Sequence, residues 1–443
     1  MTAVRLRMAV LVAVDVLTMT AVWAFDLWLY WAIGLGRYRY GWAFYLRLWP
    51  ALVAFVILNA AFRLYHGRAG SPAAPISPVE EMRRLFVSAL LTHIGVIAFI
   101  ALTRQTLKET SRVVVVVSGL LVGILAQPVR DLVRSLLFRV RAFRIPVAVL
   151  GPAPAVQTMT ASLMRDAYVG FVPVSADENP QVLVSCEGLD DFQAHYPDYV
   201  KRYAHIGYFP SAGSLPVADS RPISIDGLGG IEFVNQRKMR LLRTEKWILD
   251  KVLASVVFVC TLPLFVLLPI LIKLTSRGPV FYRHDRLGKM GRPLRVWKFR
   301  TMYEDADARL QTLLASDPER RAEWEKSFKL ADDPRVTPLG RFLRTTSLDE
   351  LPQLFNVFAG DMALVGPRPI VEKEVAFYGA DYATFSSVKP GVTGLWQASG
   401  RSDVDYGRRV ALDIHYILNW SPWLDLWIVK KTIGAVFLMR GAK

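Results

Sequence analysis

Long apolar segments dominate the first third of the chain. Four of them cover about residues 8–33, 43–62, 85–102 and 113–129. Each is close to the roughly 20 residues that a helix needs to cross the hydrocarbon core of a bilayer. We therefore expect residues 1–144 to form a four-helix transmembrane bundle.

Basic residues are divided unevenly between the two sides of these segments. Eleven Lys and Arg residues fall on the side of the first and last residues of the bundle, and five fall on the other side. Because basic residues favour the cytoplasmic side, both ends of the bundle are expected in the cytoplasm. Asp15 and Asp26 lie inside the first segment. A membrane-buried acid is a candidate functional group, but we interpret both as polar contacts within the bundle.

From Ile145 onward, short apolar runs alternate with polar helical stretches. Four runs predict strands, at 146–151, 168–174, 182–186 and 205–209. This alternation indicates a Rossmann-like α/β domain over residues 145–236. The turn after the first strand, Gly151 to Pro154, has a single glycine, whereas a dinucleotide site needs several for close backbone approach. We therefore favour a structural or regulatory role for this domain.

A fifth apolar segment, 252–272, is long enough to cross a membrane. Six basic residues, from Arg237 to Lys251, precede it and nine follow it as far as Arg300, so both flanks favour the cytoplasm. Pro263 lies at its middle and removes a backbone hydrogen bond, which kinks helices. We therefore predict a helix break at Pro263 and a re-entrant helix at about 248–274 that enters the membrane and returns.

The stretch SLDELPQLFNVFAGDMALVGPRP, residues 347–369, concentrates the candidate chemistry. Asp349 and Glu350 open it, and the apolar spacing that follows predicts a short amphipathic helix with both carboxylates in its first turn. Arg344 precedes them, and Arg368 lies between two prolines. An acidic first turn alone need only stabilise a helix. Carboxylates bracketed by arginines, however, suit chemistry on a phosphate with a bridging Mg²⁺.

Two further stretches carry basic residues. The segment WKFRTM, residues 297–302, predicts an extended strand with Lys298 and Arg300 on one face. The segment KPGVTGLWQASGR, residues 389–401, contains three glycines and ends at Arg401. It suits contact with a nucleotide or phosphate, and a plain structural loop is the alternative.

The segments SLDELPQLFNV, GDMALVGPRP, KFRTM and KPGVTGLWQASGR resemble the bacterial sugar transferase family, the monotopic phosphoglycosyl transferases. The likeness runs over roughly residues 244–431. It implies a monotopic catalytic domain over 237–443, with the re-entrant helix and amphipathic interfacial helices. The sequence departs from the family at Leu262, His284 and Ala363, where Ser, Gln and Ser are usual.

The resemblance also implies a mechanism. Asp349 attacks the sugar-bearing phosphorus of a UDP-hexose, UMP leaves, and undecaprenyl phosphate takes the hexose phosphate from the aspartyl intermediate. Asp349 and Glu350 are the implied catalytic residues and the implied ligands of Mg²⁺. The implied phosphate-binding residues are Lys298, Arg300, Arg344, Arg368 and Arg401. The implied product serves exopolysaccharide, capsule or O-antigen synthesis at the bacterial cytoplasmic membrane, with the catalytic domain on the cytoplasmic face.

The composition of the chain limits the classes of molecule that we expect it to bind. A net charge of +16 with 53% hydrophobic residues and no nucleic-acid-binding module favours membrane lipid and phosphorylated substrates over nucleic acid. Cys186 and Cys260 provide no disulfide framework. Two other classes of protein stay open, a nucleotide-binding membrane sensor and a lipid or polysaccharide translocator, but neither explains residues 347–369. The hexose, galactose or glucose, and the oligomeric state, including a homodimer, also stay open.

Overall fold

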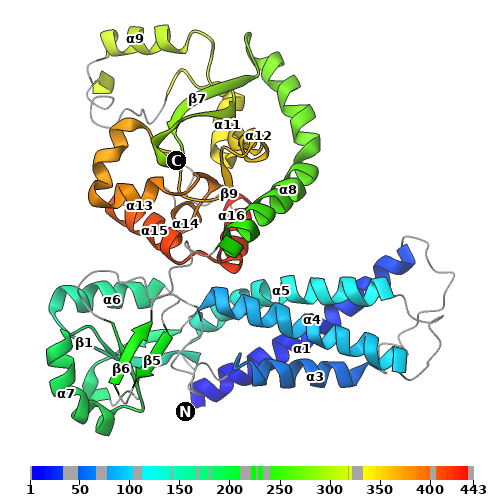
Figure 1. Cartoon of the computed structure of the whole chain (residues 1–443), viewed down its shortest axis with the longest axis vertical. Coiled ribbons are helices and arrows are strands. Elements are labelled where there is room, and N and C mark those ends of the chain that lie inside the picture. The colour runs from blue at the N-terminus through cyan, green and yellow to red at the C-terminus, as the bar shows by residue number, and fades with distance from the viewer. Residues whose placement is uncertain are drawn as a thin grey trace. The chain divides into compact units, whose positions relative to one another are not determined.

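The computed structural model forms two compact units, residues 1–213 and 214–443 (Figure 1). The described residues are 2–32, 48–65, 77–102, 112–140, 143–165, 168, 170–178, 180, 182–209, 221–225, 228–232, 240–317, 319–321, 333–399 and 406–437. Four helices among them are long and apolar enough to cross a membrane, which supports a mixed α and α/β membrane protein. The domain boundaries after residues 144 and 236 stay predictions.

Apolar helices form the first part of unit 1. They are α1 (Thr2–Ala32), α3 (Trp49–Ala61), α4 (Pro78–Leu102) and α5 (Arg112–Arg139). Met19, Phe55, Ala89 and Val122 meet in a shared core without exposed surface. Three of these helices have the length and composition to span, whereas α3 has 13 residues and is shorter than the predicted segment 43–62. Residues 43–47 of that segment lie outside the described part.

A buried charge network crosses this bundle. Arg130 on α5 donates from Nε to Asp15 on α1 (2.8 Å) and from NH1 to Glu81 on α4 (2.7 Å). Arg134 also binds Glu81, at 2.6 Å. The predicted polar contacts of Asp15 and Asp26 are both present, because Asp26 accepts a hydrogen bond from Ser118.

The prediction for the fourth segment was wrong in one respect. We expected the segment to end at residue 129 and counted the arginines after it as flanking charges. Instead, α5 continues to Arg139 and buries Arg130 and Arg134, because two carboxylates on other helices neutralise them.

A small parallel sheet forms the second part of unit 1, as the apolar runs predicted. Its strands, in the spatial order β2-β1-β3-β4, are β2 (Phe171–Pro173), β1 (Ile145–Leu150), β3 (Val182–Ser185) and β4 (His205–Tyr208). They are joined in sequence by α6 (Ala153–Arg165), the short 3-10 turn η3 (Ala176–Glu178) and α7 (Leu189–Arg202). The single glycine after β1 has a structural use. A Cβ on Gly151 would lie 2.8 Å from the backbone of Cys186, so the glycine permits close packing.

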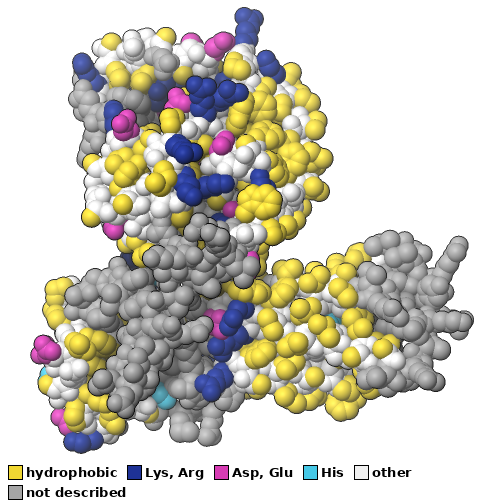
Figure 2. All heavy atoms as spheres, in the orientation of Figure 1, with side chains coloured by type: hydrophobic (Ala, Val, Ile, Leu, Met, Phe, Trp, Pro, Cys, Tyr) yellow, Lys and Arg dark blue, Asp and Glu magenta, His cyan; other side chains and the backbone are white. Residues whose placement is uncertain are grey.

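Helix α8 (Arg240–Thr275) wraps one side of unit 2 as a single bent helix (Figure 1). It stays helical through Pro263 and Pro269, so the predicted helix break at Pro263 was wrong: the helix bends but is not interrupted there. Its inner face contributes Leu268 and Ile272 to a core with Phe299 and Leu343. Its outer face is apolar and exposed, as Figure 2 shows. The exposed large apolar residues of α8 are Trp247, Ile248, Val252, Val256, Val259, Leu262, Val266, Leu267, Ile270 and Leu274.

Helices α11, α12 and α16 and strand β9, whose ranges are given below with the other elements of unit 2, pack against α8. The strands of unit 2 are β5 (Arg221–Ile225), β6 (Leu228–Glu232), β7 (Phe281–Leu287), β8 (Pro293–Phe299), β9 (Ala363–Val365) and β10 (Gly391–Thr393). Its other helices are α9 (Ala306–Ser316), α11 (Pro338–Thr346), α12 (Gln353–Ala359), α13 (Tyr382–Ser386), α14 (Leu395–Ala398), α15 (Tyr406–Leu418) and α16 (Pro422–Phe437). Its 3-10 turns are η5 (Lys289–Gly291), η6 (Leu348–Glu350), η7 (Glu372–Phe377) and η8 (Gly379–Asp381). Strands β5 and β6 pair antiparallel, as do β7 and β8, while β9 and β10 pair in parallel.

Candidate active site

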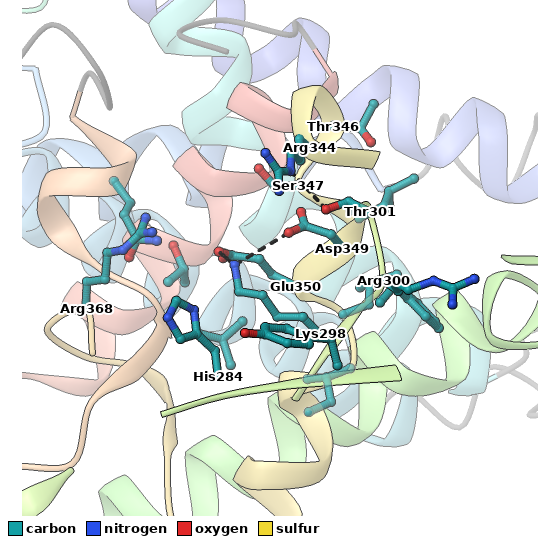
Figure 3. Close-up of a pocket in the computed structure, with 18 of the residues that line it drawn as sticks. His284, Lys298, Arg300, Thr301, Arg344, Thr346, Ser347, Asp349, Glu350 and Arg368 are labelled. Atoms are coloured by element: carbon teal, nitrogen blue, oxygen red, sulfur yellow. Dashed lines mark hydrogen bonds and ion pairs between the residues drawn. The ribbon is translucent and has the colours of Figure 1, made fainter. Parts of the chain in front are cut away.

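A cavity of about 1450 Å³ lies in unit 2 and collects the predicted carboxylates and most of the predicted cations. Figure 3 shows Asp349, Glu350 and Lys298 near its centre, with Arg368 beyond Glu350 and Lys298 as seen from Asp349. Apolar residues of α8 and α16 line another part of its wall, including Val257, Leu264 and Ile433. Charged residues therefore line one part of the cavity wall, and apolar residues line another.

The two carboxylates lie in the 3-10 turn η6, which precedes α12. The expected helix exists, but the prediction that both carboxylates occupy its first turn was wrong. Ser347 adopts a left-handed backbone conformation (φ 57°) after α11, and this bend turns the chain before Asp349. Asp349 is consequently buried, at 8% exposure, with its carboxylate at the cavity.

Lys298 on β8 connects the carboxylates. Its Nζ lies 2.8 Å from Oε1 of Glu350 and 3.5 Å from Oδ2 of Asp349. Burial raises the pKa of Asp349, an effect that Lys298 opposes and Glu350 reinforces. Within the described part of the chain, Oδ1 of Asp349 accepts no hydrogen bond, so one oxygen is left to meet a substrate.

Arg344 reaches the cavity from the last turn of α11. Its Nε donates to Oγ1 of Thr301 at 2.9 Å. The helix approaches Thr301 this closely because Gly340 has no side chain, and a Cβ there would lie 2.0 Å from the Thr301 carbonyl oxygen. Arg344 and Asp349 thus lie near the same end of α11 and line the same cavity.

Arg300 lines the cavity wall but turns its guanidinium away from Asp349 (Figure 3). Its NH2 donates to the carbonyl and hydroxyl oxygens of Ser276, at 2.9 and 2.7 Å, just after α8 ends. Strand β8 ends at Phe299, so the alternation that would place Arg300 on the face of Lys298 stops one residue short. Arg401 lies outside the described residues.

An arginine–aromatic cluster occupies the side of the cavity near Arg368. The Cζ atoms of Arg368 and Arg409 lie 5.8 and 4.6 Å from the centre of the Trp396 ring. On β7, NH2 of Arg286 lies 3.3 Å from Nδ1 of His284. Burial and the neighbouring cations lower the pKa of His284 to about 4, so this histidine is neutral at pH 7. Sequence reasoning assigned no role in the cavity to Arg286, Arg409 or His284.

Glycines explain how this cluster assembles. In the parallel pair β9–β10, a Cβ on Gly391 would lie 2.1 Å from the nitrogen of Gly366, and one on Gly394 would lie 2.4 Å from its oxygen. The two backbones touch, which brings the loop carrying Arg368 beside the helix carrying Trp396. Gly391 and Gly394 thus serve backbone packing.

Comparisons with known proteins identify the family. The model of the bacterial sugar transferase family matches residues 241–439. The exopolysaccharide production protein ExoY of Sinorhizobium fredii is 48% identical over 193 residues, which are 44% of this chain and 85% of that protein. The chain belongs to the bacterial sugar transferase family. The expectations of this family and of a transferase enzyme are therefore confirmed.

Two larger relatives share the sugar transferase region. An undecaprenyl-phosphate galactose phosphotransferase of Salmonella typhimurium is 54% identical over 165 residues, 37% of this chain and 35% of that protein. A UDP-glucose:undecaprenyl-phosphate glucose-1-phosphate transferase of Klebsiella pneumoniae is 34% identical over 244 residues, 53% of this chain and 49% of that protein. The chain thus matches about half or less of the length of these two relatives.

The donor atoms at the centre of the site fit Mg²⁺. This ion is usually held by one or two carboxylates together with substrate phosphates, and the sugar transferase has two adjacent carboxylates in Asp349 and Glu350. The described residues contain no group of three or more acidic, His or Cys side chains that would form a site without substrate. A magnesium ion here would therefore depend on the phosphates of the substrate for its remaining ligands.

Proposed function

We propose that this enzyme transfers hexose 1-phosphate from a UDP-hexose to undecaprenyl phosphate or a similar polyprenyl phosphate and releases UMP. The observation that carries the proposal is the buried carboxylate of Asp349, which faces a cavity rich in cations. Both substrates are anions, and Lys298, Arg344 and Arg368 around this cavity supply charge-assisted hydrogen-bond donors for phosphate oxygens. The relatives named for the same chemistry support it.

In the proposed mechanism, Asp349 is the nucleophile. Its Oδ1 atom forms a bond to the sugar-bearing phosphorus, and the bond from this phosphorus to the bridging oxygen breaks, so the electron pair leaves with UMP. Lys298 orients the carboxylate through Oδ2 and neutralises charge on the phosphate. An oxygen of the polyprenyl phosphate then attacks the same phosphorus, and the Asp349 carboxylate is regenerated.

Asp349 and Glu350 would hold Mg²⁺ together with phosphate oxygens. The ion would supply additional positive charge to the phosphoryl group. Glu350 is 2.8 Å from Lys298, so its second role is to keep that ammonium at the centre of the site.

The apolar surface of α8 suits a lipid substrate. Both ends of this helix are fixed to unit 2, through Lys246, which binds Asp425 at 2.8 Å, and through Ser276, which binds Arg300. A helix held at both ends by one folded unit, with an apolar stripe on its other face, suits a monotopic, re-entrant attachment at the cytoplasmic face of the inner membrane. The apolar cavity wall, including Val257 and Leu264, would receive the first isoprene units.

The donor is proposed to be UDP-galactose or UDP-glucose, because relatives named for both hexoses share this region. The galactose-named relative is the more similar of the two, which favours UDP-galactose. The resemblance to ExoY, an exopolysaccharide production protein, favours a role in exopolysaccharide assembly.

The experiment incubates membranes containing the enzyme with polyprenyl phosphate and a panel of UDP-sugars, and measures UMP and polyprenyl diphosphosugar. Asp349→Asn should lower turnover by about a thousandfold or more, because the amide is not a nucleophile. Asp361→Asn, at an exposed position, is the matched control and should retain activity. Near-normal turnover of Asp349→Asn would show that another group attacks phosphorus.

A further inference from the structure

Asn356 on α12 joins two parts of the active site, although it is not among the residues that line the cavity. Its side chain is buried, and both of its polar groups bind the backbone of β8. Oδ1 accepts a hydrogen bond from the nitrogen of Trp297 at 3.0 Å, and Nδ2 donates to the carbonyl oxygen of Arg295 at 2.8 Å. The helix that follows the carboxylates is therefore bonded to the strand that carries Lys298.

The amide of Asn356 takes the place of a third strand. In the described part of the chain, β7 and β8 form a two-stranded sheet, so one edge of β8 has no neighbouring strand. Backbone groups of alternate residues point to the same edge of a strand. Asn356 supplies one acceptor and one donor to two alternate residues, Trp297 and Arg295, and this fixes the position of β8 along its own axis.

The chain between Asn356 and the carboxylates is stiff. The turn η6, which holds Asp349 and Glu350, comes just before α12. A backbone hydrogen bond from Leu351 to the carbonyl oxygen of Leu348, at 3.2 Å, continues the turn toward the helix. A shift of α12 relative to β8 would therefore move both carboxylates with it.

Lys298 directly follows Trp297, one of the two residues that Asn356 binds. From β8 its Nζ reaches Oε1 of Glu350 at 2.8 Å and Oδ2 of Asp349 at 3.5 Å (Figure 3). The lysine side chain is flexible, so its packing alone does not determine where the ammonium group lies. The position of its backbone relative to η6 decides whether the ammonium group meets both carboxylates.

Other contacts of α12 do not fix this position. The ring centres of Phe355 and Phe281 lie 6.3 Å apart, but hydrophobic contact is not directional. Lys251 on α8 donates to two carbonyl oxygens at the end of α12, at 2.8 and 2.7 Å, and these bonds hold the helix to α8 and not to β8. The hydrogen bonds of Asn356 are directional and end on the strand itself.

We propose that Asn356 is a positioning residue, which holds β8 against α12 so that the Lys298 ammonium group meets Asp349 and Glu350. The inference rests on the proposed function and deepens it, because it names what places the cation beside the nucleophile. Asn356 acts through Lys298 and touches no substrate. A misplacement of about 1 Å by a change away from the reacting atoms can lower the rate about a hundredfold.

The first test measures the position of Lys298 without substrate or turnover. A carbodiimide joins a lysine to a carboxylate that it contacts, forming an amide bond without a spacer and releasing a urea. Full-length protein in detergent is treated with the reagent, and the cross-link between Lys298 and Glu350 is quantified by mass spectrometry. Asn356→Ala should lower its yield by about tenfold, because the two groups must already be in place to react.

Lys251→Gln is the matched control. It removes hydrogen bonds from the same helix and leaves those to β8 intact, so it should lower the Tm but keep the cross-link. If Asn356→Ala does not fold, Asn356→Gln takes its place, because its longer amide displaces β8, and its yield should also fall. A wild-type yield in a folded Asn356 variant would overturn the proposal, as would an equal loss in Lys251→Gln.

The second test measures turnover of the same proteins with a UDP-hexose and polyprenyl phosphate. The kcat/KM of Asn356→Ala should fall by about tenfold to a hundredfold, and that of Lys251→Gln should fall less. If the cross-link is lost while turnover stays at the wild-type value, Asn356 has no part in catalysis and the proposal is wrong. If wild type forms the cross-link but releases no UMP from any UDP-sugar, the proposed function fails while the placement of Lys298 by Asn356 stands.

Discussion

Asp413 on α15 is a buried acid whose titration should affect the stability of the protein. It has no exposed surface and its Oδ1 has no hydrogen-bond partner in the described part of the chain, while Oδ2 accepts a hydrogen bond from Tyr378 at 2.9 Å. Burial raises its pKa from 3.8 to about 7, and the Tyr378 hydrogen bond only partly opposes this. The folded protein therefore favours the protonated acid.

The sign of the pH dependence follows from this shift. Between pH 3.8 and about pH 7 the folded state binds a proton that the unfolded state has released, so stability falls as the pH rises through that window. One pKa unit corresponds to about 1.4 kcal/mol. The free energy of unfolding should therefore decrease by about 4 kcal/mol by pH 8, and about 2 kcal/mol of this decrease should occur above pH 5.5.

The assay compares thermal unfolding of detergent-solubilised wild type and Asp413→Asn at pH 5.5 and pH 8. Asparagine keeps the shape and the acceptor for Tyr378 but does not titrate, so the variant should lose less stability between the two pH values, by about 2 kcal/mol or roughly 4–8 °C in Tm. Asp381→Asn, at an exposed site, is the control and should follow wild type. Parallel pH profiles of wild type and Asp413→Asn would refute the reasoning.

Three further predictions concern the active site and the membrane. The pKa of Asp349 is raised above 3.8, so the nucleophile should become protonated, and turnover should fall, at a pH above 3.8. A pH–rate profile whose acid limb lies below pH 3.8 would contradict this. Gly391→Ala should destabilise the protein by about 1–3 kcal/mol in thermal unfolding, whereas Gly434→Ala, which has open space, should not. In intact cells, cysteines at Thr244 and Met290 should both be shielded from an impermeant thiol reagent, and labelling of one alone would show a spanning helix.

The helices, strands and motifs that depend on the local pattern of residues could be predicted from the sequence. Apolar length identified the bundle helices and α8, and short apolar runs identified the parallel strands. The carboxylates and Lys298 were predicted together because they lie in distinctive motifs, and the cavity does bring them together. The exact turn holding Asp349 was missed, because the left-handed conformation of Ser347 has no local signature in a serine.

Features that depend on distant contacts could not be predicted. From the sequence alone, Arg130 was interpreted as a flanking charge. Its role as a buried ion-pair partner depends on Asp15, which is 115 residues away in the chain. Arg409 and Trp396 become one cluster with Arg368 only through the pairing of β9 and β10. Arg300 was assigned to the phosphate face because strand alternation was assumed to continue past Phe299.

The buried charge network of the bundle also sets an order of assembly during synthesis. Asp15 and Glu81 leave the ribosome well before the two arginines that neutralise them, and Asp15 precedes Arg130 by 115 residues. At roughly 5–20 residues per second this interval lasts about 6–23 s. An unpaired charge within a membrane costs several kcal/mol. A nascent chain that stops before Arg130 therefore leaves Asp15 and Glu81 without the arginine that neutralises both of them in the folded bundle.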